Sequence, residues 1–126
     1  MKIKSTKFYR NLLTKTVGDF LLKYNGVRFR ETTQIRENAR ELWRKLELPD
    51  YCELCGYSKY YELCHIKPIS YFSPEDKIIL VNSPSNLIAL CPNHHKELDK
   101  ELMDASDLIK IKNICQYRAK PYIGKV

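Results

Sequence analysis

Residues 86–95 read Asn-Leu-Ile-Ala-Leu-Cys-Pro-Asn-His-His, an aliphatic run followed at once by a cysteine, a proline and two histidines. The run at 87–90 predicts a short buried strand. Pro92 suits the first turn of a helix, because the N–H that proline lacks has no helical partner at that position. A strand is therefore expected to lead directly into a helix, with Cys91 and His94 at the junction.

A second pair with the same spacing lies upstream of this segment. Cys52 and Cys55 are separated by two residues, as are Cys91 and His94. Zinc in structural sites takes four ligands in tetrahedral geometry, and the two pairs together supply three sulfurs and one nitrogen. We therefore expect a structural Zn²⁺ on these four side chains. The alternative is that the thiols are buried or exposed without a metal.

Two other zinc-binding patterns do not fit this spacing. A finger with two cysteines and two histidines has about twelve residues between its pairs, whereas Cys55 and His94 are much farther apart. Zinc deaminases carry a His-x-Glu upstream of Pro-Cys-x-x-Cys. Here His95-Lys-Glu97 follows the cysteine pair, and that pair lacks the proline.

The remaining histidines indicate a second metal site. His95 and Asp99 are four residues apart on the expected helix, so both side chains can face one point. His65 lies within residues 60–69, whose aromatic and β-branched residues predict a strand. A strand and a helix can therefore bring an imidazole close to a divalent cation. Hydrolysis of a phosphodiester needs both, a base for the water and a cation for the charge on the phosphate.

Three segments together resemble the HNH nuclease motif, namely residues 52–56, 63–69 and 86–95, and the resemblance covers residues 50–103. It implies an α+β fold, with a small ββα-metal (HNH) core around a structural zinc. It also implies a metal-dependent endonuclease, a phosphodiester hydrolase that cleaves DNA with Mg²⁺ or another divalent cation such as Mn²⁺.

Position in the motif also implies a role for individual residues. His65 corresponds to the general base that activates water, and Asn86 to the asparagine whose side chain holds the loop and so orients that base. His95 and Asp99 correspond to helix ligands of the catalytic cation. Cys64 replaces an Asp or His that usually binds this cation, and a thiolate suits Mg²⁺ poorly. Cys64 is therefore either a ligand for a softer metal or a core residue facing away from His65.

Basic residues are concentrated at the N-terminus. The chain has 22 Lys and Arg against 15 Asp and Glu, a net charge of +7, and residues 1–30 carry eight of the bases and one acid. Such a segment is either a phosphate-binding footprint or a solubilising surface. The other candidate DNA contacts are Arg36, Arg40, Arg44 and Lys67. Glu37 and Glu41 interleave with the arginines, which is also typical of a plain exposed helix face.

We expect three segments along the chain. Residues 1–49 hold the basic segment and an amphipathic helix over 33–46, residues 50–103 hold the nuclease core, and residues 104–126 hold a C-terminal helix and tail. The apolar residues of the first helix recur at helical spacing; they are Ile35, Ala39, Leu42, Trp43 and Leu46.

Other boundaries follow from local signals. Residues 17–24 are compatible with a helix or a strand that ends at Gly26. The helix beginning at Pro92 is expected to reach Leu102. In the last helix the expected apolar stripe consists of Leu108, Ile111 and Cys115.

Composition excludes several classes of protein. No apolar run is long enough for a membrane span, and no signal-peptide pattern is present. The odd number of five cysteines argues against a disulfide framework, so a cytoplasmic location is the default expectation.

Double-stranded DNA is the expected partner, and the protein is expected to be a monomer or a homodimer. Two alternatives stay open: a non-catalytic zinc-stabilised DNA-binding module, which Cys64 favours, and a zinc-containing protein-interaction domain.

Overall fold

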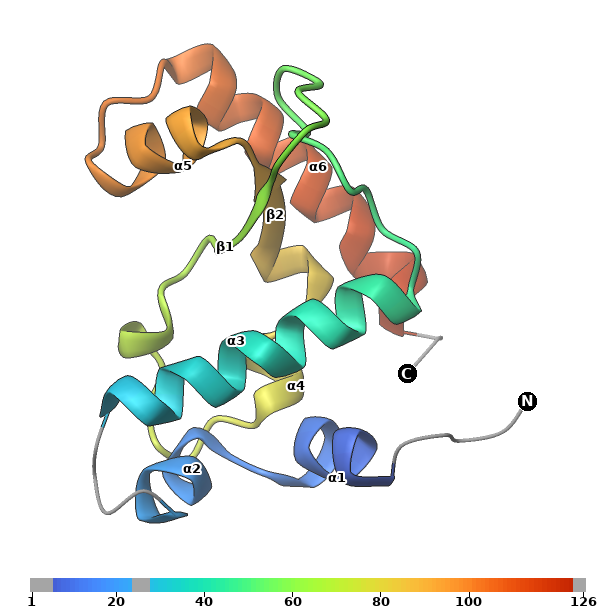
Figure 1. Ribbon diagram of the computed structural model, residues 1–126, viewed down its shortest axis with the longest axis vertical. Coiled ribbons are helices and arrows are strands. Elements are labelled where there is room, and N and C mark those ends of the chain that lie inside the picture. Colours follow the sequence, from blue (N-terminus) through green and yellow to red (C-terminus); the bar gives the residue numbers. More distant parts are fainter. Residues whose placement is uncertain (1–5, 24–27, 124–126) are drawn as a thin grey trace. The chain divides into compact units, whose positions relative to one another are not determined.

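The computed structural model describes residues 6–23 and 28–123, with side chains over 7–20 and 32–118 (Figure 1). Contacts between residues divide the chain into two compact units. The first unit is Met1–Leu46 with Lys67–Asn82, and the second is Glu47–Ile66 with Ser83–Val126. In the described ranges no helix combines the length and the apolar character needed to cross a membrane.

The first unit is helical. Its elements are α1 (Thr6–Thr14), α2 (Val17–Lys23), α3 (Arg28–Lys45), the 3₁₀ helix η1 (Ile69–Tyr71) and the short α4 (Ile78–Val81). Helix α1 packs against α3 and α4, and α2 packs against α3. The ambiguity at residues 17–24 is therefore resolved in favour of a helix, whereas Gly26 lies outside the described residues.

Helix α3 buries four of the five residues of the stripe that its sequence predicts, whereas the fifth, Leu46, lies just beyond the helix and is half-buried. Ile35, Ala39, Leu42 and Trp43 are each at most 3% exposed. The predicted start at residue 33 is wrong, because the helix begins at Arg28. The apolar periodicity in the sequence begins at Ile35, so it gave no signal for the turns before it.

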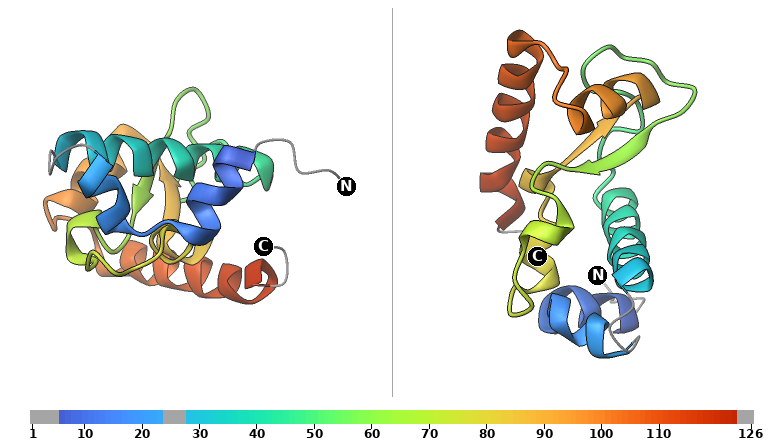
Figure 2. Two further views of the ribbon diagram at one scale, coloured as in Figure 1. Left: turned by 90° about the horizontal axis from the view of Figure 1, so that it is seen from below. Right: turned by 90° about the vertical axis from the view of Figure 1, so that its left-hand side faces the viewer.

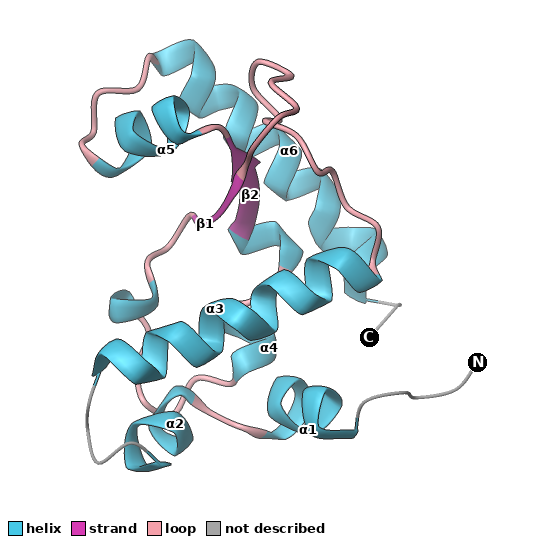
Figure 3. Ribbon diagram, viewed as in Figure 1, coloured by secondary structure: helices cyan, strands magenta, loops and turns pink. Residues whose placement is uncertain are grey.

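The second unit has the order strand, strand, helix. Its elements are β1 (Glu62–His65), the 3₁₀ helix η2 (Pro84–Asn86), β2 (Leu87–Leu90), α5 (Pro92–Asp99) and α6 (Ala105–Ile123) (Figure 3). Strands β1 and β2 are antiparallel, with Glu62 opposite Leu90 and His65 opposite Leu87. Helix α5 contacts both strands. The prediction of an α+β fold with a ββα core is confirmed.

Strand β2 forms the centre of the second unit. All four of its residues are fully buried. Ile88 and Leu90 share an apolar cluster with Cys64, Ile111 and Cys115, and α6 lies alongside β2 and η2 (Figure 2). Two members of the stripe predicted for the last helix therefore face this core, but Leu108 is 46% exposed and the prediction is wrong there.

Two predicted lengths are wrong. Strand β1 covers only Glu62–His65 of the predicted 60–69. Pro68 lacks an N–H for further strand pairing, and η1 follows it directly. Helix α5 ends at Asp99 rather than at Leu102, because Glu101 adopts a left-handed conformation with φ of 58°.

A buried ion pair attaches α6 to the segment that carries the first cysteine pair. The Arg118 guanidinium donates to the Glu53 carboxylate and also to the Leu87 carbonyl, at 2.8 Å for the latter. The second carboxylate oxygen of Glu53 accepts the Ala89 N–H at 2.9 Å. The Arg118 side chain is 12% exposed and the Glu53 side chain is 6% exposed. Burial raises the pKa of Glu53, and the Ala89 N–H and Arg118 offset this only in part.

Candidate metal centre and catalytic site

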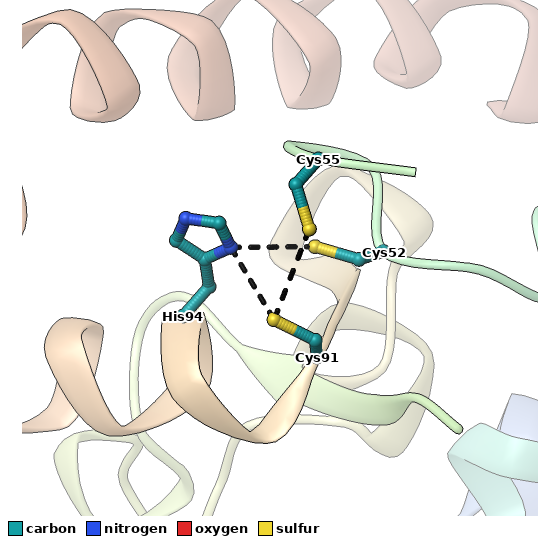
Figure 4. Close-up of side chains that lie close together, drawn as sticks. All are labelled: Cys52, Cys55, Cys91 and His94. Atoms are coloured by element: carbon teal, nitrogen blue, oxygen red, sulfur yellow. Dashed lines mark hydrogen bonds between the residues drawn. The ribbon is translucent and has the colours of Figure 1, made fainter. Parts of the chain in front are cut away.

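The predicted zinc ligands come from two tight backbone features. Cys52 and Cys55 lie on a turn in which the Gly56 N–H donates to the Cys52 carbonyl at 2.8 Å, and Gly56 has the positive φ of 81° that this turn requires. Cys91 immediately precedes α5 and His94 lies in its first turn. Figure 4 shows the four side chains turned toward one another.

The distances within this cluster fit a tetrahedral metal site. The four ligand atoms all lie within 4.8 Å of one another. The Cys55 and Cys91 sulfurs are 4.0 Å apart, and His94 Nδ1 lies 3.4 Å from the Cys91 sulfur and 3.5 Å from the Cys52 sulfur. A tetrahedral zinc ion, with Zn–S of about 2.3 Å and Zn–N of about 2.0 Å, requires about 3.8 Å between sulfurs and about 3.5 Å between sulfur and nitrogen. The cluster could therefore hold a metal ion such as zinc.

Cys52 is prepared for metal binding by its surroundings. Burial raises the pKa of its thiol, but this effect is outweighed by hydrogen bonds from the backbone of Cys91, Cys55 and Leu54 and from the His94 ring, which together lower the pKa to about 6. Thiolate is the form of cysteine that binds metal. At neutral pH Cys52 is therefore mostly in its metal-binding form.

Cys55 shows the opposite effect. A hydrogen bond from the Tyr57 backbone lowers the pKa of its thiol, but burial and the neighbouring thiols of Cys52 and Cys91 raise it more. Negative charges in one site oppose the ionisation of each other. A bound cation would remove this repulsion, so the electrostatics of the cluster favour a divalent metal.

The outer nitrogen of His94 faces acidic residues. Its Nε2 lies 4.0 Å from the Asp107 carboxylate at the start of α6, and Glu97 also belongs to this group. Metal-binding histidines commonly turn their second nitrogen toward a carboxylate, which fixes the orientation of the ring. Sequence reasoning missed Asp107, because no spacing rule connects it with His94.

The structure brings the second predicted pair together as well. His95 Nε2 lies 3.4 Å from an Asp99 carboxylate oxygen, so the two residues face one point on α5. Within the part of the chain that the structure describes, no third His, Cys or carboxylate ligand atom lies within 4.8 Å of both. On the other side of the ring, Nδ1 is 2.5 Å from the Glu62 carboxylate. Glu62 was not predicted as a site residue.

His65 and Asn86 are neighbours across the hairpin. His65 is the last residue of β1, and its Nδ1 is buried while the side chain as a whole is half-buried. The next residue, Ile66, donates its N–H to the Asn86 carbonyl at 2.8 Å. The Asn86 carbonyl therefore holds the backbone beside His65.

Cys64 lies in the core. It is 2% exposed and belongs to the apolar cluster with Ile88 and Leu90. Its thiol donates to the Glu62 carbonyl at 3.6 Å. No candidate metal group among the described residues includes it. The structure therefore supports the interpretation of Cys64 as a core residue, rather than as a ligand for a softer metal.

The predicted DNA contacts belong to the first unit. Arg36, Arg40 and Arg44 are exposed on α3 and follow one another at four-residue spacing. Lys67 is exposed, with its ammonium nitrogen 4.4 Å from the centroid of the Phe72 ring. Among the bases of residues 1–30, the side chains that lie outside the described residues are Lys2, Lys4, Lys23, Arg28 and Arg30.

Comparison with known families gives one finding. Residues 52–103 match a family model described as HNH endonuclease, and the match spans all four cluster ligands together with Glu62, His65, Asn86, His95 and Asp99. Comparison of the whole chain with curated proteins and with solved structures gave no match.

Proposed function

Residues 52–103 belong to the HNH endonuclease family, and from this membership we propose that the chain is a metal-dependent endonuclease that hydrolyses the phosphodiester bonds of DNA. The observation that carries the proposal is the order of the matched segment. Its strand β1 carries His65, Asn86 directly precedes β2, and His95 lies on α5.

In this proposal His65 is the general base. Its buried Nδ1 leaves Nε2 to accept a proton from the attacking water. Attack on the phosphorus in line with the departing 3′ oxygen then breaks the phosphodiester bond. The backbone carbonyl of Asn86 holds Ile66 and so limits movement of the strand end that carries His65. The role of the Asn86 side chain in orienting the base stays a prediction.

His95 and Asp99 are the proposed holders of the catalytic cation, either Mg²⁺ or Mn²⁺. Ligand atoms on adjacent positions of an octahedral Mg²⁺ lie about 3.0 Å apart, and the 3.4 Å between His95 Nε2 and the Asp99 oxygen is close to this value. When bound, a divalent cation neutralises charge on the phosphate oxygens and the departing oxygen. The two protein ligands leave room for water and phosphate oxygens around such an ion.

The two basic regions are the proposed source of affinity for DNA. The arginines of α3 and Lys67 are exposed, and the bases of residues 1–30 add further positive charge. Contacts between these cations and phosphates do not depend on base sequence and weaken as salt concentration rises. Zinc at the four-residue cluster is proposed to be structural, because these residues lie in or beside the apolar core of the second unit.

Relaxation of supercoiled plasmid tests the proposal. The zinc-loaded protein is incubated with plasmid in Mg²⁺, Mn²⁺ or EDTA, beside His65→Ala and the control Ser58→Ala, an exposed residue of the same unit. We expect nicking only with added divalent metal, unchanged in S58A and reduced about 10²- to 10⁴-fold in H65A, the usual range for loss of a general base. Cleavage by H65A at the rate of the unmodified protein would refute the assignment of the base.

The second candidate is a zinc-stabilised DNA-binding module without catalysis. The observation that favours it is the burial of Cys64, whose position in the motif is usually that of a ligand of the catalytic cation. The proposed cation site then has two protein ligands, His95 and Asp99, and would bind the cation weakly. The same plasmid experiment distinguishes the two functions. Retardation of the plasmid in a gel, with no nicks in any metal, would establish the binding module.

A further inference from the structure

Glu62 and His95 form a contact that the mechanism above does not use. Glu62 is the first residue of β1, and one of its carboxylate oxygens lies 2.5 Å from His95 Nδ1. The two side chains are 35% and 24% exposed, so water screens the contact only in part. The contact joins the strand that carries His65 to the helix that carries the proposed cation ligands.

The distance identifies this contact as a hydrogen bond. Two atoms that bind adjacent positions of one small divalent cation lie about 3.0 Å apart, which is longer than the 2.5 Å between Glu62 and His95 Nδ1. Glu62 therefore does not share a cation with Nδ1. An ionised carboxylate can only accept a hydrogen bond, so the proton of this contact belongs to Nδ1.

A proton on Nδ1 determines the chemistry of the other ring nitrogen. In a neutral imidazole only one nitrogen carries a proton and the other has a free lone pair. When the ring is neutral and Nδ1 carries the proton, as in a ring that binds a metal, the lone pair is on Nε2, the nitrogen that lies 3.4 Å from the Asp99 carboxylate. The two carboxylates therefore have different tasks. Glu62 holds the ring, and Asp99 lies on the side where a metal ion can bind.

We propose that Glu62 is a positioning residue, which holds His95 in the tautomer and orientation whose Nε2 binds the divalent cation. This inference rests on the proposed function of His95 as a cation ligand. The alternative is that the contact between Glu62 and His95 only attaches α5 to β1 and has no effect on metal binding. A purely structural contact would affect the stability of the second unit but not the tautomer of His95 or the affinity for the cation.

The tautomer of His95 can be measured directly. Long-range ¹H–¹⁵N correlation spectra of the zinc-loaded full chain at pH 8, without added Mg²⁺ or Mn²⁺, report which ring nitrogen carries the proton. We expect protonated Nδ1 in the unmodified protein and in Glu62→Gln, whose amide oxygen still accepts the hydrogen bond. In Glu62→Ala we expect the Nε2-protonated form to appear, because nothing then holds the proton on Nδ1.

The affinity for Mn²⁺ gives the second measurement. Free Mn²⁺ is followed by electron paramagnetic resonance during titration of the zinc-loaded proteins. Loss of the residue that orients a metal-binding histidine weakens binding about 10- to 100-fold, and we expect this for E62A and a smaller loss for E62Q. The control is Glu101→Gln, which removes an exposed negative charge just beyond α5 and should leave the affinity unchanged.

The possible outcomes separate this inference from the function on which it rests. If the unmodified protein binds Mn²⁺ and nicks plasmid, but E62A binds Mn²⁺ equally well, the nuclease stands and the role of Glu62 is refuted. Protonated Nε2 in the unmodified protein would refute it too. If the unmodified protein neither binds Mn²⁺ nor cleaves DNA, both the function and the inference fall together. Thermal melting of each variant shows whether a loss comes from unfolding.

Discussion

Glu101 ends α5 in a conformation that most residues avoid. Its φ is 58°, its N–H donates to the Leu98 carbonyl at 3.2 Å, and the Leu102 N–H donates to the Glu97 carbonyl at 2.8 Å. This pair of bonds is the Schellman motif, in which glycine is the preferred residue at the left-handed position. A side chain in this conformation costs about 1 to 2 kcal/mol, and glycine loses about 0.5 to 1 kcal/mol more than alanine in backbone entropy on folding.

Replacing Glu101 with glycine should therefore stabilise the protein. We expect Glu101→Gly to raise the free energy of unfolding by about 0.5 to 1 kcal/mol, which is measurable by urea denaturation. Glu101→Ala keeps the Cβ atom and serves as the control, with no gain of this size. Equal stability of the glycine and alanine variants would contradict the argument.

The Cys52 thiol determines part of the pH dependence of metal binding. Its pKa of about 6 lies below the ordinary value of 9.0, so above pH 6 the sulfur is mostly thiolate and below pH 6 protons compete with the metal. As the pH falls from 7 to 5, we expect the apparent affinity for zinc to fall by at least about tenfold from this group alone. Competition with a chromophoric chelator measures it, and a constant affinity over this range would contradict the lowered pKa.

At the level of elements, the buried pair of Arg118 and Glu53 attaches α6 to the rest of the second unit. Removing one member leaves the other charge buried without its partner, which costs about 3 to 5 kcal/mol. We therefore expect Arg118→Ala to lower the free energy of unfolding by about this amount. The control Arg44→Ala removes an exposed arginine of α3 and should change stability by at most about 0.5 kcal/mol. A small effect of R118A would show that α6 does not depend on this pair.

Sequence patterns predicted those parts of the fold and site that depend on local spacing. The buried stripe of α3 and the pair His95 and Asp99 follow from helical periodicity. The four cluster ligands follow from two pairs with identical spacing. The spacing within each pair lies within a few residues of sequence, whereas the approach of the two cluster pairs, 36 residues apart, depends on how the second unit folds.

Residues that act over long separations could not be predicted in this way. Glu62 and His95 are 33 residues apart, and Glu53 and Arg118 are 65 apart. No periodicity relates such pairs, since their contact depends on how the hairpin and α6 pack. The end of α5 was missed because a glutamate in the left-handed conformation leaves no composition signal, whereas the end of β1 was marked in the sequence by Pro68.

At the level of the whole molecule, the chain divides the proposed tasks between its two units. The cluster of three cysteines and His94 and the proposed catalytic residues belong to the second unit, and the arginines of α3 and Lys67 belong to the first. The segment Lys67–Asn82 returns to the first unit between the two halves of the second. The division into residues 1–49, 50–103 and 104–126 stays a prediction.

The proposed DNA contacts predict a specific dependence on salt. The logarithm of the DNA-binding constant falls with the logarithm of salt concentration by about 0.9 for each phosphate contact. We expect the variant R36A/R40A/R44A to lower this slope by about 2.7 if each arginine contacts one phosphate. Fluorescence anisotropy with a duplex at several salt concentrations measures the slope. The control K110A/K112A removes exposed positive charge from α6, and equal changes in both variants would argue against a contact through α3.

The division of the metal cluster between two distant turns also makes its assembly a question of timing. Cys55 and Cys91 lie 36 residues apart, and a ribosome adds about 5 to 20 residues per second. The first cysteine pair is therefore synthesised about 2 to 7 s before Cys91 and His94 are added to the chain. During that interval no four-ligand site exists to hold the Cys52 and Cys55 thiols, and an oxidant that joins them would prevent the cluster from forming. If the cluster binds zinc as proposed, the supply of zinc and the redox state during these seconds would affect how much of the newly made protein acquires the metal.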